Sequence, residues 1–173
     1  MTARQVFIAL PMFLTMYVFQ EAVVNQFRLP GGGFSLFLIF TLVWAILSTP
    51  EVAALAGFLG GFLMDFSQSS SGPIGQWTLL MIAACYGVAY IGSGSESLSG
   101  SPLGFTFLTT AAVLLVECAY VFTALLFGLQ FGNFGQIAIT IFGISTWSLV
   151  ITPIVLPIFS RLHAVTFDTR SKI

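Results

Sequence analysis

Six apolar segments, separated by short stretches rich in Gly, Pro, Ser or Asn, make up most of this 173-residue chain. The longest of them, 103–127 and 136–159, exceed the roughly 20 residues that an α-helix needs to cross the hydrocarbon core of a bilayer. Within lipid, a helix satisfies every backbone polar group inside its own segment. The sequence therefore predicts an all-α, polytopic membrane protein.

Charged residues are too scarce for a soluble domain of this length. Lys, Arg, Asp and Glu make up 6% of the chain, against about 25% in an average soluble domain. The five Lys/Arg form no cluster, which excludes electrostatic binding of nucleic acid. Cys85 and Cys118 lie inside apolar segments and give neither a disulfide framework nor a zinc motif. The expected environment is the lipid bilayer.

The second and third segments are separated only by Ser48 to Glu51, and fusing them would give five spans instead of six. Thr49, Pro50 and Glu51 favour a separate helix start, because Thr caps, Pro suits the first helical position and an acid complements the helix dipole. We therefore predict one transmembrane domain over residues 1–173, a compact bundle of six helices. Its expected spans are 5–24, 34–48, 50–66, 76–91, 103–127 and 136–159.

Basic residues are concentrated at the two ends of the chain. Arg4 precedes the first segment, and Arg161, Arg170 and Lys172 follow the last one. Lys and Arg near helix ends favour the cytoplasmic side. Six spans place both termini in the cytoplasm and leave Arg28 in the first external loop, whereas five spans would separate Arg4 from the other three.

A stripe of small residues on the third segment ends in a carboxylate. Counting by fours gives Ala53, Gly57, Gly61 and Asp65, which share one face of a helix. Such a stripe lets two helices in a membrane approach closely. Two interpretations stay open: the stripe packs the chain's own helices while Asp65 caps or reaches toward the external surface, or the stripe contacts a partner.

Glu117 lies near the middle of the fifth segment. A charge at such a depth costs about 2.5–3.5 kcal/mol on insertion scales, and the membrane segments offer no basic residue to pair with it. It is therefore expected to be protonated or hydrogen-bonded to another helix. A ligand-binding carboxylate and a polar contact with a partner helix both fit, while a proton relay is disfavoured because Asp65 is the sole other candidate.

Enzymatic chemistry finds no support in the sequence. It contains no HExxH, GxSxG or GxxxxGK[ST] motif and no pair of nearby carboxylates. His163, the only histidine, follows the last segment and is expected in a solvated tail, and Trp77 is expected as an interfacial anchor. Pro153 and Pro157 should kink the last helix. We predict a protein that is not an enzyme, with no catalytic, cofactor-binding or metal-binding residues.

Two neighbouring motifs resemble the rod shape-determining protein MreD family. They are the run from Gly57 to Asp65 and the turn Ser71-Gly72-Pro73-Ile74-Gly75, which leads into a helix containing Tyr86-Gly87. The likeness extends over nearly the whole chain, through Arg28-Leu29-Pro30 with three following glycines, to the acid Glu117. The chain differs in having Gly33-Phe34 where an acidic residue often stands, and in a fourth loop poor in basic residues.

The resemblance implies a non-catalytic component of the cell-wall elongation (rod) complex in the bacterial inner membrane. MreD proteins work with the single-span protein MreC, the RodA glycosyltransferase, a penicillin-binding transpeptidase and the MreB filament. On this basis the chain is expected to bind an MreC-like partner and help control peptidoglycan synthesis and cell shape. The residues that would contribute are the interface stripe Ala53, Gly57, Gly61 and Asp65, the buried Glu117, and the turn residues Gly72, Pro73 and Gly75.

A second resemblance provides an alternative from another functional class. Six helices with short loops are also similar to the substrate-binding membrane subunits of energy-coupling-factor vitamin transporters, whose fold MreD proteins are expected to share. A binding subunit should present polar and aromatic groups around an outward pocket. The candidates in this sequence are Asp65, Gln68, Gln76, Trp77 and Asn133.

Overall fold

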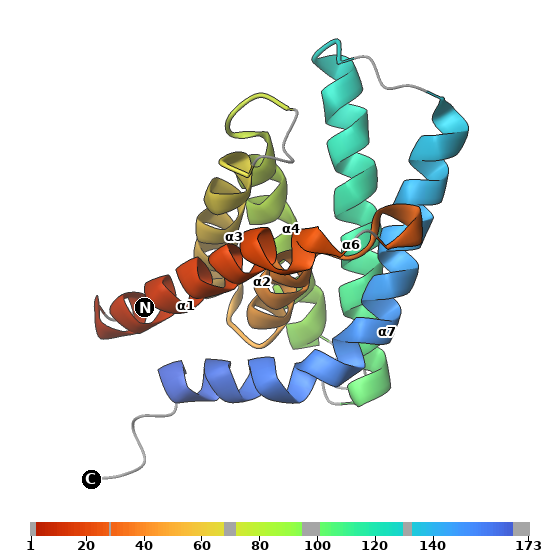
Figure 1. Ribbon diagram of the computed structural model, residues 1–173. Helices are drawn as coiled ribbons and strands as arrows, with labels where there is room; N and C mark the ends of the chain where they lie inside the picture. Colours follow the sequence, from red (N-terminus) through yellow and green to blue (C-terminus); the bar gives the residue numbers. More distant parts are fainter. Residues whose placement is uncertain (1–2, 28, 68–71, 95–100, 130–132, 168–173) are drawn as a thin grey trace, which may run out of the picture.

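The part of the chain that the structure describes contains six α-helices and no strand. The structure is a computed structural model describing residues 3–27, 29–67, 72–94, 101–129 and 133–167. Each apolar segment contains one helix, so the all-α prediction is confirmed. The helices are α1 (Ala3–Ala22), α2 (Leu36–Ile46), α3 (Pro50–Asp65), α4 (Gln76–Gly94), α6 (Pro102–Leu126) and α7 (Phe134–Phe167), with the short 3-10 turns η1 (Val24–Gln26) and η2 (Pro30–Gly32) between α1 and α2 (Figure 1).

Four of the helical segments are long and apolar enough to cross a membrane: 8–26, α4, α6 and α7. The outer surface carries large exposed apolar side chains, among them Leu79, Phe107 and Phe142, which a soluble monomer rarely exposes in such number. The helices α2 and α3 are shorter. With 11 residues at 1.5 Å per residue, α2 is about 16 Å long, well short of a hydrocarbon core of about 30 Å.

The short helix α2 forms the centre of the molecule. Every residue from Phe37 to Ile46 is buried, and α2 contacts α1, α3, α4, α6 and α7. A helix that is surrounded on all sides needs apolar residues on all sides. This position explains why residues 34–48 show no polar face, although the segment is too short to span a bilayer.

Aromatic rings of α1 and α7 pack against those of α2. The Phe13 ring of α1 lies 5.0 Å from Phe40 and 5.5 Å from Trp44, and the Phe159 ring of α7 lies 5.1 Å from Phe40. These pairs meet edge to face, the arrangement that the ring quadrupole favours. The core therefore joins the first and last helices through the second.

The last helix bends and continues past its expected end. Figure 1 shows α7 descending and then turning across the bottom of the molecule, and Pro153 and Pro157 lie within it. Each proline removes a backbone donor and crowds the preceding turn, which bends a helix. His163 is thus half-buried, with Nε2 3.0 Å from Ser48 Oγ and its ring 4.4 Å from that of Phe167. The expectation of a solvated tail histidine is wrong, because the helix continues over the core.

Two glycines bring α3 and α4 into backbone contact. A Cβ added to Gly61 would lie 2.5 Å from Thr78 Cα, and one added to Gly57 would lie 2.8 Å from the carbonyl carbon of Met81. Real side chains do not approach so closely, so this interface requires glycine at both positions. Close packing of this kind is what holds helices together in lipid, where burying apolar surface gives little advantage.

The loop between α1 and α2 is fastened to α7. Its three glycines have positive φ values of 74°, 88° and 73°, which glycine adopts without steric cost. Gly31 lies against Gly143 of α7 so closely that neither position leaves room for a side chain. The Trp147 indole Nε1 donates a hydrogen bond to the Pro30 carbonyl at 3.1 Å. The loop is thereby held over the N-terminal end of α2.

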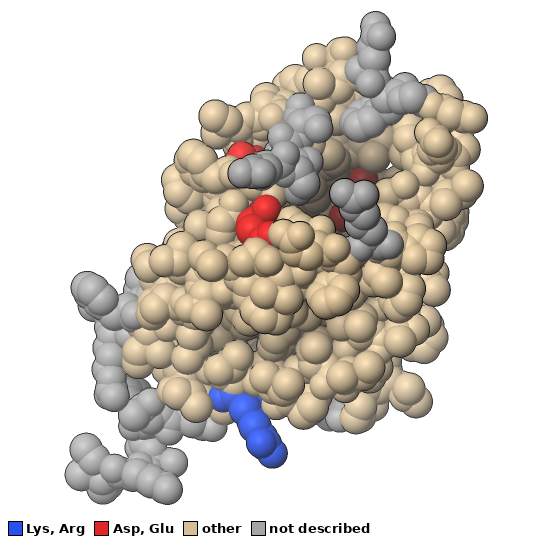
Figure 2. Space-filling view, in the orientation of Figure 1, with Lys and Arg blue, Asp and Glu red and all other residues tan. Residues whose placement is uncertain are grey.

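Acidic side chains of the described residues gather on one part of the surface. Figure 2 shows them in the upper half of one face, some of them inside a hollow, whereas the basic atoms that it colours lie at the lower edge. The hollow belongs to the region above α2, where the loop and the upper parts of α6 and α7 surround an incompletely filled space.

Candidate functional site

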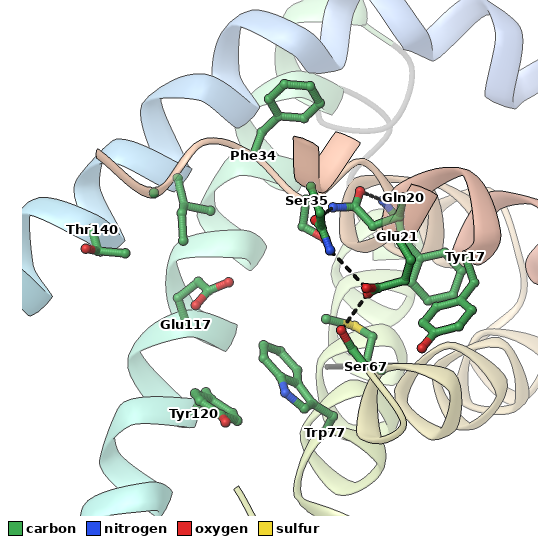
Figure 3. Close-up of a pocket in the computed structure, with 15 residues that line it drawn as sticks. Tyr17, Gln20, Glu21, Phe34, Ser35, Ser67, Trp77, Glu117, Tyr120 and Thr140 are labelled. Carbon is green, nitrogen blue, oxygen red and sulfur yellow. Dashed lines mark hydrogen bonds between the residues drawn. The ribbon is translucent and has the colours of Figure 1, made fainter. Parts of the chain in front are cut away.

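A cavity of about 370 Å³ lies where the short central helix α2 begins. It is enclosed by α1, the loop before α2, the start of α4 and the facing sides of α6 and α7 (Figure 3). Its walls combine carboxyl, amide and hydroxyl groups with aromatic rings. The lining residues are Tyr17, Gln20, Glu21, Asn25, Gly32, Phe34, Ser35, Phe37, Met64, Ser67, Trp77, Glu117, Tyr120, Thr140 and Ile144.

Glu21 is held in place on the α1 side of the cavity. Its carboxylate accepts a hydrogen bond from Ser67 Oγ at 2.5 Å and another from Asn25 Nδ2 at 3.1 Å. The side chain of Gln20 extends this network by donating to Asn25 Oδ1 at 2.7 Å and accepting from the backbone N–H of Phe37 at 3.2 Å. The network thus links α1 to the first turn of α2 and fixes the direction of the carboxylate.

Glu117 approaches the same cavity from α6, on the opposite wall. Figure 3 shows its side chain projecting into the space between α6 and the α1 side. The structure gives this carboxyl no hydrogen bond or ion pair with any described residue. An acid near the middle of a spanning helix without a protein partner is unusual, since such groups are normally paired. The two acids, far apart in sequence, are thus brought to one cavity.

Aromatic rings form the wall nearest α4. Trp77 and Tyr120 are stacked, with ring centroids 4.4 Å apart and planes inclined by 18°. Gln76 strengthens this contact between α4 and α6, because its Nε2 donates to the Tyr120 carbonyl at 2.9 Å and to Thr123 Oγ1 at 2.7 Å. Trp77 is buried, so its expected role as an interfacial anchor is wrong.

Asp65 caps the helix that follows its own. Its carboxylate accepts hydrogen bonds from the backbone N–H groups of Trp77 at 3.0 Å and Thr78 at 3.2 Å, and from Thr78 Oγ1 at 2.5 Å. These donors lie in the first turn of α4, whose N–H groups have no partner within the helix and carry partial positive charge. Ala53, Gly57 and Gly61 are buried on α3, and the two glycines face α4.

The turn residues connect these two helices. Gly72 and Pro73 precede α4, the Pro73 carbonyl accepts a hydrogen bond from Gln76 N at 3.1 Å, and Gly75 has a φ of +97°. Gly72 lies directly against the Gln76 amide, which would have to shift if a Cβ were added there. Asp65, the turn and the glycine contacts therefore form one structural unit that lies beside the cavity without lining it.

The pocket residues suggested for a transport subunit are only partly brought together. Trp77 lines the cavity, whereas Asn133 lines an adjoining space of about 290 Å³ between α6 and α7. Asp65 stabilises the contact between α3 and α4, and Gln76 stabilises the contact between α4 and α6. Gln68 lies outside the described residues. Sequence reasoning missed Tyr17, Gln20, Glu21 and Tyr120. The available signal was the polar cluster at the end of the first apolar segment.

The cavity has the composition of a binding site. It offers two carboxyl groups on opposite walls, and among the described residues no group of three or more His, Cys, Asp or Glu is placed to hold a metal ion. Its lining includes neither histidine nor cysteine. No family model, curated protein or solved structure matches the chain.

Proposed function

We propose that this chain is an MreD-like, non-catalytic component of the bacterial cell-wall elongation machinery, which binds a single-span MreC-like partner in the inner membrane. The observation that supports the proposal most strongly is the arrangement of the residues that carry the resemblance. The Gly57–Asp65 run and the Gly72–Gly75 turn form one unit, in which Asp65 caps α4 at Trp77 and Thr78. The two motifs, which are separated in the sequence, therefore both serve the contact between α3 and α4.

The proposal includes six membrane crossings with both termini in the cytoplasm. The contact of Ser48 with His163 brings the α2–α3 turn beside the last part of α7, and a contact of Met12 with Thr166 brings the first half of α1 there as well. Arg161 lies on that part of α7, so the positive-inside rule favours this end as cytoplasmic. In the proposed second crossing, α2 covers only part of the bilayer thickness, and non-helical backbone covers the rest. Such backbone is tolerated at membrane depth where protein surrounds it.

The partner helix needs a surface other than the Gly57/Gly61 face, because α4 already occupies that face. A shallow apolar groove of about 300 Å³ runs between α4 and α6. Its walls include Ala83, Gly87, Ala112 and Ala119, and a Cβ added to Gly87 would meet nothing within 4 Å. Both helices are long enough to span the membrane. Small side chains that face lipid allow another helix to approach closely, so we place the partner's membrane span in this groove.

The test of the function is a mild-detergent pull-down of the tagged protein from its native membrane. Recovery of a single-span coiled-coil protein together with a RodA-type glycosyltransferase and a penicillin-binding transpeptidase is the expected result. The synthases and the MreB filament are proposed to associate directly or through the MreC-like partner. Absence of all these proteins from the eluate of a well-folded bait would contradict the proposal.

Gly87→Phe is expected to reduce recovery of the partner at least tenfold without unfolding the protein. The phenylalanine would fill the groove, and nothing within the chain stands in its way. Quantitative mass spectrometry of the pull-down measures the effect. The matched control is Gly94→Phe, on the same helix and equally open, which should leave recovery unchanged. Normal recovery with Gly87→Phe would mean that the groove holds lipid and that the partner docks elsewhere.

The cavity favours a second candidate, a substrate-binding subunit of an energy-coupling-factor transporter. Polar groups and an aromatic pair converge on a space of about 370 Å³, as small-molecule sites do. The same pull-down distinguishes this role. Recovery of ATP-binding cassette subunits and a coupling membrane protein would favour it over the role in cell-wall synthesis.

A further inference from the structure

We propose that the cavity between α1, α4 and α6 binds a small organic cation, held between the carboxylates of Glu21 and Glu117 and beside the Trp77–Tyr120 ring pair. The proposal goes beyond the role in the cell-wall machinery and does not depend on it. It can be tested on the purified chain with no partner protein present, so the failure of either proposal is recognised separately.

Acidic groups on both walls are the first argument. The protein groups that bind Glu21 are the neutral side chains of Ser67 and Asn25, which orient its charge without cancelling it. Glu117 has no partner among the described residues, and the described residues that line the cavity include no Lys or Arg. Carboxylates withdrawn from water are costly unless a counter-charge is present. A cation in the cavity supplies that charge, and an anion is repelled.

The shape of the site favours an organic cation over a metal ion. The two acids lie on opposite sides of the cavity in Figure 3, and no metal-holding group of three or more His, Cys, Asp or Glu occurs among the described residues. A volume of about 370 Å³ is near the lower end of the range for small-molecule pockets, about 300–1,000 Å³. It therefore suits an amine or guanidine with a compact carbon skeleton.

The aromatic wall provides the remaining recognition. Ammonium and guanidinium groups are attracted to the faces of Trp and Tyr rings, and Trp77 and Tyr120 lie beside Glu117 in Figure 3. The stacked pair is held rigid by the hydrogen bonds of Gln76 to the Tyr120 carbonyl and Thr123. A rigid wall loses little conformational freedom on binding. The expected ligand therefore combines a positive charge with an apolar or aromatic part.

Two neighbouring spaces share lining residues with the cavity. A space of about 450 Å³ beneath the loop shares Glu21, Asn25, Gly32 and Phe34 with the cavity. The space of about 290 Å³ between α6 and α7 shares Glu117, Tyr120 and Thr140. Glu21 therefore also lines the space beneath the loop, and Glu117 also lines the space between α6 and α7.

Binding is tested by titration calorimetry and thermal unfolding of the full-length protein in detergent. The probes are benzylammonium, putrescine and tetramethylammonium, with benzyl alcohol as the neutral match of the first and phenylacetate as an anion. At least one cation should bind and raise the unfolding temperature by several degrees, whereas benzyl alcohol and phenylacetate should do neither. Absence of binding by all three cations, or equal binding of the neutral or anionic compound, overturns the proposal.

Two variants locate the binding. Glu117→Gln keeps the size of the side chain and breaks no hydrogen bond of the described structure, and it should weaken cation binding at least tenfold. Glu21→Gln keeps an acceptor for Ser67 and should weaken cation binding similarly. It provides a second, independent measurement if one of the two variants folds poorly. Glu51→Gln, at the exposed start of α3, should bind as the unaltered protein does. Unchanged affinity in Glu117→Gln and Glu21→Gln would place the ligand elsewhere and overturn the proposal.

Discussion

Replacing Gly57 and Gly61 together with leucine is expected to prevent the bundle from folding. An added Cβ at either position overlaps the backbone of α4, at Met81 or at Thr78. Backbone cannot move aside as a flexible side chain can, so α3 and α4 must separate along their whole contact. Overpacking commonly costs about 1–3 kcal/mol per site even where side chains can adjust. Two such sites against backbone should cost more than about 4 kcal/mol, a large part of the roughly 5–15 kcal/mol that stabilises a protein.

The measurement is size-exclusion chromatography of a fluorescent fusion after extraction in mild detergent, followed by thermal unfolding. The double variant should elute as aggregate, and each single variant should unfold at a lower temperature than the parent. Gly94→Leu is the control, because a Cβ there meets nothing within 4 Å. A monodisperse double variant with an unchanged unfolding temperature would contradict the backbone contact.

Asp65→Ala should destabilise the protein by about 2–4 kcal/mol, the second largest effect. It removes the acceptor of three hydrogen bonds and leaves two backbone N–H groups at the start of α4 without a partner. One bond to a charged group contributes about 1.5–3 kcal/mol. Because the three bonds share one carboxylate, their contributions are not additive, and the unsatisfied donors bring the loss to the upper part of this range or slightly beyond it. The carboxylate also complements the helix dipole there. Thermal or denaturant unfolding in detergent measures the change.

Asp65→Asn provides a graded comparison. The amide keeps one acceptor oxygen for the Trp77 or Thr78 N–H and loses the charge, so its effect should be about half that of alanine. Glu51→Ala is the matched control, because Glu51 is an acid on the same helix and is exposed. Equal stability of the parent and Asp65→Ala would show that the cap contributes nothing.

The helices were predictable because their boundaries depend on local chemistry. Thr49-Pro50-Glu51 predicts a helix start, and α3 begins at Pro50. The apolar segments 76–91 and 103–127 correspond to α4 (Gln76–Gly94) and α6 (Pro102–Leu126), since Gly, Pro and Ser mark both ends. Helix number therefore follows from the apolar segments and the residues that interrupt them.

The interior was not predictable in the same way. In a soluble protein the polar face of a helix shows which side is buried, but lipid and protein core are both apolar. Nothing in residues 36–46 therefore indicates that α2 is surrounded by protein. The site depends on the same missing information: Glu21 and Glu117 line one cavity from opposite sides, and Trp77 is buried against the Tyr120 ring. Neither the position of the two acids nor the contact of Trp77 with Tyr120 produces a periodic pattern in the sequence.

The position of α7 over the core has a consequence for how the protein is made. The rings of Phe159 and His163, 5.1 Å from Phe40 and 5.0 Å from Trp44, belong to α7, which leaves the ribosome long after α2. Synthesis proceeds from the N-terminus at about 5–20 residues per second, so α2 spends several seconds in the membrane before this cover exists. During that interval lipid or the insertion machinery must shield Trp44, and the native core closes only after α7 has been synthesised.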